Sequence, residues 1–366
     1  STRKESSAAS DVYKRQIMDK TTIPSSIVDI DASWMAAALG QPITGVNHEQ
    51  IGEGVGVSSA VYRSTLEGGD LDSVVVKLPA LAEEAVFTST VLRMYIREVR
   101  FFENLAGQSP IRVPVGYHGA VDLETSQFVQ VMEDMGSMRM VDQNEGMNID
   151  DAQRAVDELA AWHATFWRKA DAPVDRGDVV CLSDPVYPAV LPMVFAEGWE
   201  KVNNAMDVDP VIASVGPGWV EWMPSALERL SSAPNTITHG DYRADNILFD
   251  DEGNVVLLDF QLTGRGSASY DLAYFVTQSL APDLAATHET ALFNRWLDGL
   301  IAAGVPEADT TNLWDRYRDA ALFCLVYPVV ASRGMDISDE RQYALVDNMN
   351  TRFVRAVDQL HLADLL

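Results

Sequence analysis

The chain has 366 residues, of which 47% are hydrophobic and 22% charged, a composition typical of a globular protein with a sizeable core. Its formal net charge of −27 argues against nucleic acid or an anionic membrane as a partner. Two cysteines in so long a chain form no disulfide framework and indicate a reducing, cytoplasmic setting. The longest apolar run, residues 320–331, contains Pro328 and is too short to span a bilayer.

The N-terminal region divides into a tail and a first helix. Residues 1–20 contain five Lys or Arg against three Asp or Glu, lack the apolar core of a signal peptide, and include a plausible natural start at Met18. We therefore expect residues 1–20 to be a disordered or incidental tail. The pattern of residues 31–39 predicts a short helix, with Asp31 as its N-cap.

A glycine-rich stretch follows at residues 51–59. Three alternate glycines would let backbone N–H groups approach phosphate oxygens, and a serine hydroxyl could add another donor. A plain hairpin is the simpler explanation of such a run, but a strand-like segment follows it directly. The residues concerned are Gly52, Gly54, Gly56 and Ser58.

A buried-looking strand over residues 73–78 carries a single lysine, Lys77, for which an edge lysine that reaches water is the simpler explanation. The next segment, residues 83–106, is predicted to be one helix because its apolar residues recur at helical spacing. Glu98 lies beside that apolar stripe and could reach a lysine on a strand. Glu103 on the same helix is the competing candidate.

Residues 127–132 alternate like a strand and run into an acidic segment, residues 133–136. Residues 150–168 form a strong helical pattern, on which His163 is more simply a packed core histidine than a ligand or catalyst. Residues 171–235 contain prolines and three tryptophans and give no clear pattern. Most of these tryptophans are expected to belong to the core.

The most informative stretch is residues 238–260, where two short apolar runs flank Asp-Asp-Glu-Gly-Asn. Turn residues between β-formers predict a hairpin. If Asp250 lies opposite Val255, then Asn246 lies opposite Asp259. Two side chains with oxygen atoms would then leave the same end of one rigid hairpin.

A carboxylate and an amide oxygen at one place suit Mg²⁺, which takes few protein ligands and keeps other positions for water and phosphate oxygens. Asn246 and Asp259 are therefore the expected metal ligands. Asp241 lies on the loop that enters the hairpin and is free to orient or deprotonate a hydroxyl.

The order of these three residues resembles the catalytic apparatus of kinases. The sequence motif His-Gly-Asp-x-x-x-x-Asn, followed by Leu-Asp-Phe-Gln, resembles that of the aminoglycoside phosphotransferase family in its broad sense, which includes choline and ecdysteroid kinases. Gln261 stands where protein kinases carry glycine, which argues against a protein kinase. The resemblance implies an α+β, two-lobed protein-kinase-like fold with an N-lobe at 21–132, a hinge at 133–136 and a C-lobe at 137–366.

The resemblance also implies roles for individual residues. Lys77 would hold the nucleotide phosphates and Glu98 would fix Lys77. In the hinge, the carbonyl of Glu133 and the N–H of Met135 would pair with the base of the nucleotide.

Two further residues are implied to support the site. His239 is expected to hold the shape of the catalytic loop, with a phosphate contact as the lesser alternative. Asp271, in the segment after the metal aspartate, resembles the family residue that braces this loop from below.

The predicted function is therefore Mg²⁺-dependent transfer of a phosphoryl group from ATP or GTP to a hydroxyl of a small molecule. A neutral, partly apolar acceptor is expected, because the wording around Glu98 resembles the ecdysteroid-kinase branch and seven of eight tryptophans lie beyond the hinge. The alternatives are an aminoglycoside or other antibiotic O-phosphotransferase and, in another class, a nucleotide-binding pseudokinase that serves as an interaction module. The sequence gives no indication of the oligomeric state.

Overall fold

The computed structural model describes residues 23–52, 58–206, 208–334 and 338–366. The predicted tail at residues 1–20 lies outside these ranges. Contacts divide the chain into two units. Unit 1 comprises the chain up to Thr90 together with Pro114–Ser137, and unit 2 comprises Val91–Val113 together with Met138–Leu366. Residues 91–113, which the sequence analysis assigned to the N-lobe, thus group with unit 2.

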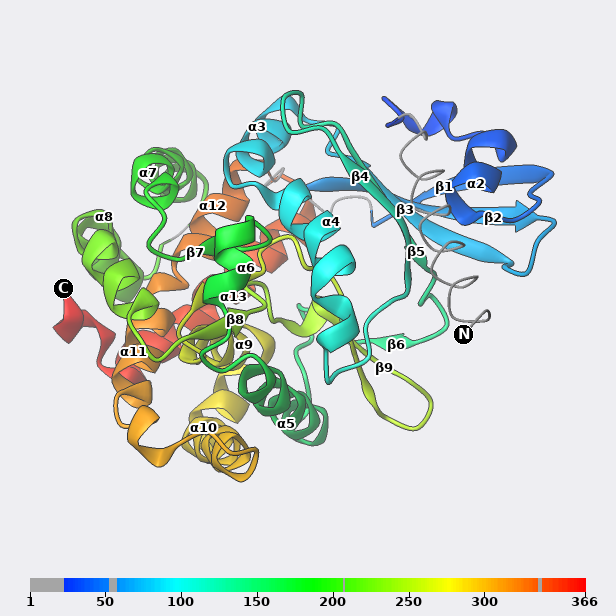
Figure 1. Cartoon of the computed structure of the whole chain (residues 1–366). Helices are drawn as coiled ribbons and strands as arrows, with labels where there is room; N and C mark the ends of the chain where they lie inside the picture. The colour runs from blue at the N-terminus through cyan, green and yellow to red at the C-terminus, as the bar shows by residue number, and fades with distance from the viewer. Residues whose placement is uncertain (1–22, 53–57, 207, 335–337) are drawn as a thin grey trace. The chain divides into compact units, whose positions relative to one another are not determined.

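Unit 1 is built on a five-stranded antiparallel sheet with the strand order β1-β2-β3-β5-β4 (Figure 1). Its strands are β1 (Gly45–Ile51), β2 (Ser59–Glu67), β3 (Ser73–Pro79), β4 (Gly116–Val121) and β5 (Phe128–Glu133). Its helical elements are η1 (Ile27–Asp29), α2 (Ala32–Leu39) and most of α3 (Glu83–Val91). The predicted cap of α2 is confirmed, because the Asp31 side chain accepts a hydrogen bond from the Trp34 N–H at 2.8 Å.

Alternation along β3 decides which side chains enter the core of unit 1. Val74, Val76 and Leu78 are buried, whereas Lys77 points to the opposite face and is partly exposed. In the ladder Lys77 lies opposite Val61 of β2 and Gln130 of β5. The lysine is therefore on a central strand, which excludes the interpretation as an edge lysine.

The prediction of one helix over residues 83–106 is wrong, because the chain forms two helices. Helix α3 ends at Val91, and α4 (Met94–Asn104) begins after Arg93, whose φ of 56° is left-handed. Residues 86–91 contain four β-branched side chains, which favour helix weakly. The apolar stripe continues only on α4, so only this part is held as a helix by burial.

His118 on β4 is an acid-sensitive residue in the core of unit 1. Its side chain is 3% exposed and meets the Trp34 ring edge-on with ring centroids 5.4 Å apart. Within the described part of the chain neither ring nitrogen has a hydrogen-bond partner. Burial lowers the pKa of His118, because the charged imidazolium loses its hydration.

We expect unit 1 to lose stability below a pH of about 6.5, because His118 is protonated there in the unfolded chain but stays neutral in the folded protein. The loss should be at most about 1.4 kcal/mol per pH unit and should stop at the lowered folded-state pKa. Chemical denaturation from pH 7.5 to 5 would measure it. His118→Phe should flatten this dependence, whereas the control His288→Phe, in unit 2, should leave it unchanged; equal slopes in all three proteins would contradict the assignment.

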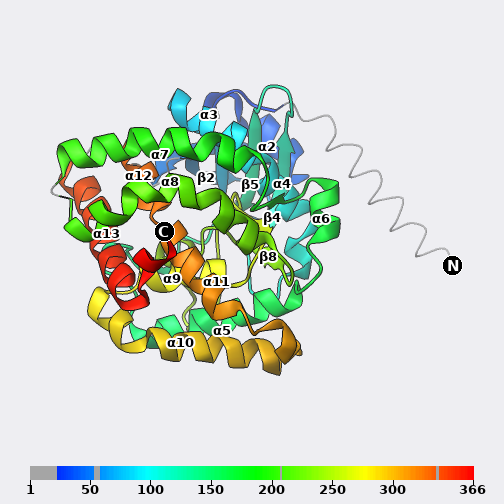
Figure 2. The ribbon, with the colours of Figure 1, turned by 90° about the vertical axis from the view of Figure 1, so that its left-hand side faces the viewer.

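Unit 2 is mainly helical. Its helices are α4, α5 (Ile149–Thr165), α6 (Asp171–Arg176), α7 (Val186–Ala205), α8 (Pro210–Ser231), α9 (Ser269–Ser279), α10 (Pro282–Ala302), α11 (Leu313–Phe323), α12 (Val326–Gly334) and α13 (Glu340–Leu360), with short 3₁₀ turns η2 to η5 (Ala106–Gln108, Ala244–Asn246, Glu307–Asp309 and Leu362–Leu365). Helix α10 runs beside α5, and α7 beside α8 (Figure 2). None of the helices in the described ranges is long and apolar enough to cross a membrane.

Helix α9 is the centre of unit 2, since every one of its residues is buried. Two three-stranded sheets lie in this unit, with the orders β10-β9-β6 and β7-β11-β8. Their strands are β6 (Arg139–Met140), β7 (Val180–Cys181), β8 (Thr236–Thr238), β9 (Ile247–Phe249), β10 (Val255–Leu257) and β11 (Gly264–Gly266). Strands β8, β9, β10 and β11 enter or leave the segments that carry the predicted catalytic residues.

The hairpin β9–β10 forms as predicted, but its predicted register is wrong by one residue. Val255 pairs with Phe249, so Asn246 lies opposite Leu258 and not opposite Asp259. The reason is a three-residue loop, in which Gly253 has a φ of 82° and the Asp250 carboxylate accepts the N–H groups of residues 252 and 254.

Candidate active site

The loop with the predicted base, residues 239–246, is anchored on α9. Asp271 is completely buried and accepts the N–H of His239 through Oδ2 and the N–H of Gly240 through Oδ1, both at 2.8 Å. Two backbone N–H groups on one carboxylate hold the start of the loop in a single orientation. These are the contacts that a brace of the loop would make.

His163 on α5 orients the Asp271 carboxylate by a hydrogen bond. Its Nδ1 accepts the indole N–H of Trp296 at 3.1 Å, and an indole nitrogen can only donate. The proton therefore lies on Nε2, which donates to Asp271 Oδ2 at 2.9 Å. His163 is a packed histidine, as predicted, and it also fixes the residue that holds the loop, which the sequence analysis did not foresee.

His239 joins the catalytic loop to the segment after β10. Its Nε2 lies 2.9 Å from the carbonyl oxygen of Leu258 and must donate to it, while Nδ1 accepts the N–H of Asp241 at 3.2 Å. Both ring nitrogens are therefore used in holding backbone. This arrangement supports the expected role in loop shape more than a phosphate contact.

Asp241, Asn246 and the segment of Asp259 meet at the open end of the hairpin. The Asn246 side-chain nitrogen donates to Oδ2 and to the backbone oxygen of Asp241, both at 2.9 Å. The Leu258 N–H donates to the Asn246 backbone oxygen at 2.9 Å, so Asp259 follows directly. Asp259 itself has a left-handed φ of 64°, a costly conformation that turns it out of the strand direction.

This arrangement fits a hard cation such as Mg²⁺. Because the Asn246 nitrogen is committed to Asp241, its side-chain oxygen is the atom left for a metal. Asp259 supplies a carboxylate at the next position of the hairpin end. In the described ranges no three His, Cys, Asp or Glu residues are grouped to hold a metal. The expected site, with Asn246 and Asp259 as its two protein ligands, would rely on water and phosphate oxygens for the other positions.

Arg243 is a feature of the site that the sequence analysis missed. Its Nε lies 3.2 Å from Asp241 Oδ1 and its Nη1 lies 2.6 Å from Asp245 Oδ2. Asp245 is held in turn by the N–H of Gln143 at 3.0 Å. Burial lowers the pKa of Arg243, but the two carboxylates raise it more, so it stays charged. A basic residue two positions after the base was the available signal.

Gly240 leaves no room for a side chain. Its φ is 86°, and a Cβ would lie 2.1 Å from the carbonyl oxygen of Leu262. We expect Gly240→Ala to displace the loop of Asp241 and to lower turnover by about 10²-fold or more. Steady-state kinetics and circular dichroism would separate displacement from unfolding. Gly304→Ala is a suitable control, since Gly304 also has a positive φ but has open space around it; wild-type turnover in Gly240→Ala would contradict the argument.

The expected phosphate loop of unit 1 is described only at its ends. Gly54 and Gly56 lie outside the described residues. Gly52 has a left-handed φ of 70°, and the carbonyl of Ser58 accepts the Ser89 hydroxyl at 3.3 Å. Their predicted contacts with phosphate stay predictions.

Lys77 belongs to unit 1 and Glu98 to unit 2, so their expected pairing also stays a prediction. Glu98 is 1% exposed on α4. Its competitor Glu103 is exposed and pairs with Arg100 at 2.7 Å, one turn earlier on the same helix. This difference favours Glu98 as the functional carboxylate.

The predicted hinge begins where β5 ends, at Glu133. The Glu133 carboxylate accepts the N–H of Val115 at 3.1 Å, and Met135 is buried. Between them, Asp134 accepts from Arg63 and Ser73 at 2.8 Å each. Burial raises the pKa of Asp134, but these hydrogen bonds lower it more, so the net pKa falls. Asp134 thus fixes the segment in which backbone groups were expected to bind the base.

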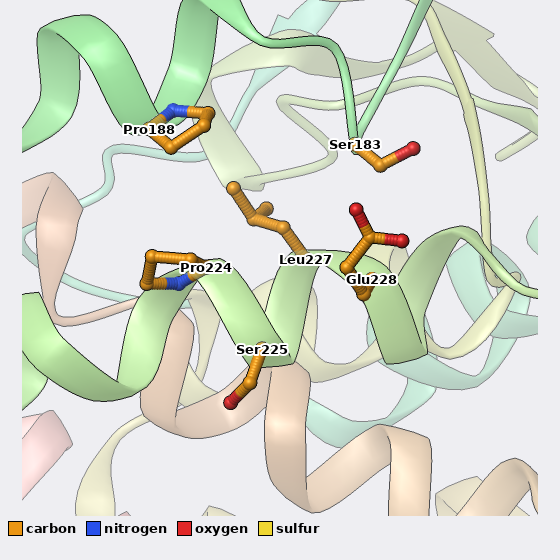
Figure 3. Close-up of a pocket in the computed structure, with 6 residues that line it drawn as sticks. All are labelled: Ser183, Pro188, Pro224, Ser225, Leu227 and Glu228. Atoms are coloured by element: carbon orange, nitrogen blue, oxygen red, sulfur yellow. The ribbon is translucent and has the colours of Figure 1, made fainter.

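Neither of two hollows found within unit 2 is lined by a predicted catalytic residue. The first, of about 240 Å³, lies between Ser183 and the start of α7 on one side and α8 on the other (Figure 3). The second, of about 330 Å³, lies between the α7–α8 connection and α13.

Most of the tryptophans of unit 2 are buried in its core. Trp162, Trp219 and Trp296 are completely buried in the main core of unit 2, and Trp222 is 7% exposed. The prediction that most of the three tryptophans of residues 171–235 are core residues is confirmed, since Trp219 and Trp222 are buried and Trp199 packs against the core. The number of tryptophans beyond the hinge therefore says nothing about the acceptor.

Solved structures with the same fold are kinases and phosphotransferases. A protein assigned to the aminoglycoside phosphotransferases, from Ralstonia eutropha, aligns with a TM-score of 0.56 and 17% identity, covering 90% of this chain and 97% of that one. Choline kinase from Cryptosporidium parvum aligns with a TM-score of 0.53 and 11% identity, and the alignment covers 96% of this chain and 95% of that one. Spectinomycin phosphotransferase, solved with ADP and spectinomycin, aligns with a TM-score of 0.52 and 12% identity, and the alignment covers 92% of this chain and 98% of that one. The search of curated sequences returned no match.

The fold is therefore the protein-kinase-like fold of small-molecule kinases, as the sequence predicted. Residues 49–319, about three quarters of the chain, match the family model described as the phosphotransferase enzyme family. The chain belongs to this family and is a small-molecule phosphotransferase. The predicted resemblance to aminoglycoside phosphotransferases and choline kinases is confirmed.

Proposed function

We propose that the protein transfers the terminal phosphoryl group of ATP or GTP to a hydroxyl of a small molecule, with Mg²⁺ as the metal. The observation that carries the proposal is the fixed arrangement of Asp241, Asn246 and Asp259 at one end of the hairpin, held by Asp271 and His239. Phosphoryl transfer depends mainly on positioning and on neutralising charge, and this arrangement serves both.

Within this proposal Asp241 orients the acceptor hydroxyl and accepts its proton as the phosphoryl group leaves the nucleotide. Its Oδ1 and Oδ2 each have a partner, Arg243 and Asn246, so the carboxylate is held in one orientation. Asn246 and Asp259 would hold Mg²⁺, which neutralises charge on phosphate oxygens when bound. Asp241, Asn246 and Asp259 are all present in the chain, which argues against the alternative of a pseudokinase.

The nucleotide would be bound mainly by unit 1. We assign the phosphates to Lys77 with Glu98, and the base to backbone atoms of Glu133 and Met135. The phosphate loop would comprise Gly52, Gly54, Gly56 and Ser58. A structural neighbour, spectinomycin phosphotransferase, was solved with ADP, which supports a nucleotide as donor here.

For the acceptor we propose a neutral, partly apolar alcohol. The tryptophans no longer support this choice, but aromatic faces do border the catalytic loop. The Tyr327 hydroxyl donates to the Gly240 carbonyl at 2.9 Å, and the Tyr274 ring stacks on Tyr327 with centroids 3.9 Å apart. Tyr274 is 2% exposed and packs against Tyr327 from within unit 2, so only Tyr327, which is partly exposed, is a ring that an acceptor with apolar surface could contact.

A coupled assay of nucleotide consumption would test the proposal, with ATP and GTP each offered to a panel of sterols, hydroxyacyl compounds, amino alcohols and aminoglycosides. We expect turnover with neutral alcohols that requires Mg²⁺. Turnover with aminoglycosides alone would replace the acceptor and keep the reaction. Nucleotide binding without turnover on any acceptor, in protein with intact Asp241, would favour the interaction module.

A further inference from the structure

The two cysteines of the chain have opposite environments. Cys324 is fully buried, and burial raises the pKa of its thiol well above the usual value. Cys181, the last residue of β7, is partly exposed. Burial raises the pKa of Cys181 too, but its hydrogen bonds with Ser183 and Arg265, together with the nearby Ser231 hydroxyl, lower it more, so the net pKa falls. A thiolate is the reactive form of cysteine.

The side chains around Cys181 form a small polar site. Its sulfur lies 3.2 Å from the Ser183 hydroxyl and 3.3 Å from Nη1 of Arg265. Arg265 is directly opposite Cys181 in the β7–β11 ladder, and its Nε is held by Asp171 at 2.8 Å. The cation is therefore fixed beside the sulfur from the neighbouring strand.

Ser231, at the end of α8, is an independent sign of a missing partner. It is 6% exposed, and the carbonyl of its neighbour Leu230 accepts the N–H of Ser267 at 2.6 Å, so the end of α8 lies beside β11, the strand that carries Arg265. The Ser231 oxygen nevertheless makes no hydrogen bond of normal geometry within the described residues. A buried hydroxyl without a partner is unfavourable, because it has lost its hydration without gaining a hydrogen bond. An oxygen atom added to the sulfur would give this hydroxyl an acceptor.

A hollow on the surface lies beside Ser183, the serine whose hydroxyl contacts the sulfur. Ser183 and Pro188 line one side of this space of about 240 Å³, and Pro224 and Leu227 of α8 line the other (Figure 3). A molecule of liquid water occupies about 30 Å³, so a molecule of peroxide size fits easily beside Ser183. Glu228 makes the hollow acidic, which favours a neutral reagent over an anionic one.

We propose that Cys181 is a site of reversible oxidation by hydrogen peroxide, which forms a sulfenic acid whose oxygen is bound by Arg265, Ser183 and Ser231. The thiolate sulfur attacks one oxygen of the peroxide, the S–O bond forms and the O–O bond breaks. Two electrons pass from sulfur to the peroxide, and the leaving hydroxide takes a proton from solvent to become water. A thiol reductant reverses the step through a mixed disulfide.

The test uses the full chain treated with hydrogen peroxide and dimedone, a reagent that traps sulfenic acids. Mass spectrometry of peptides would give the labelling rate at each cysteine. We expect Cys181 to be labelled at least about tenfold faster than Cys324 in the folded protein and faster than in the urea-unfolded chain. Dithiothreitol added before dimedone should abolish the label. In urea the two cysteines should react alike.

Three variants connect the rate to the neighbours of the sulfur. Arg265→Gln and Ser183→Ala should each slow labelling of Cys181 several-fold and raise the pH at which iodoacetamide reacts at half its maximal rate. Arg295→Gln is the matched control, because Arg295 also pairs with an aspartate but lies on α10. Equal labelling of both cysteines in the folded protein, or no acceleration of Cys181 over the unfolded chain, would overturn the proposal. If Arg265→Gln does not fold, an unchanged rate in Ser183→Ala overturns it.

Discussion

Asp241→Asn is expected to abolish most phosphoryl transfer and to leave nucleotide binding nearly intact. The substitution keeps the shape of the side chain but removes the proton acceptor, and loss of a general base typically lowers the rate by about 10²–10⁴-fold. The prediction follows from the contacts of Asp241, whose Oδ1 accepts from Arg243 and whose Oδ2 accepts from Asn246, so that the carboxylate has one fixed orientation. Turnover should be measured at saturating nucleotide, and nucleotide affinity by calorimetry.

Asp251→Asn is the matched control, since it makes the same chemical change at an exposed residue of the hairpin turn. It should keep wild-type turnover. A fall in nucleotide affinity in Asp241→Asn, as large as the fall in turnover, would assign Asp241 to the metal or nucleotide. Unchanged turnover would remove it from the mechanism.

Asp259→Gly is expected to remove Mg²⁺-dependent nucleotide binding without unfolding the protein. Glycine accepts the left-handed φ of 64° at this position, so the substitution removes the carboxylate and relieves the backbone at the same time. Loss of the ligand should weaken binding of the Mg²⁺-nucleotide complex by at least about tenfold, because changes around a metal site typically lower metal affinity by about 10–100-fold. The melting temperature should stay within a few degrees of wild type.

Asp259→Asn provides the second measurement, because asparagine also tolerates a left-handed φ and retains one oxygen ligand. It should bind the Mg²⁺-nucleotide complex with intermediate affinity. Calorimetry with and without Mg²⁺ distinguishes metal binding from nucleotide binding. If Asp259→Gly binds the complex like wild type, Asp259 is not a metal ligand, whatever its effect on turnover.

Local pattern was sufficient where one short segment carried the information. The Asp31 cap, the strand that carries Lys77 and the helix of His163 depend on neighbours in sequence and were predicted correctly. The resemblance of the His-Gly-Asp-x-x-x-x-Asn and Leu-Asp-Phe-Gln motifs to those of known small-molecule kinases was enough to predict the kinase-like fold and the family.

Pattern failed where several local preferences compete. The helix over residues 83–106 breaks at Arg93, because β-branched residues weaken the segment before it while burial supports only the segment after it. The hairpin register changed by one residue, because the Asp250 carboxylate and Gly253 select a three-residue loop from several that the same residues allow.

The sequence by itself determined the class of chemistry, because the expected base and the expected metal ligands occur in one stretch of about twenty residues with a characteristic order. Only the tertiary structure decided how that stretch is held. Asp271, His163 and Trp296 come from α9, α5 and α10 to fix the loop. The same holds for the tryptophans, whose burial in the core depends on packing between distant helices. Contacts between residues more than a hundred positions apart follow from packing of the whole unit, and no local pattern encodes them.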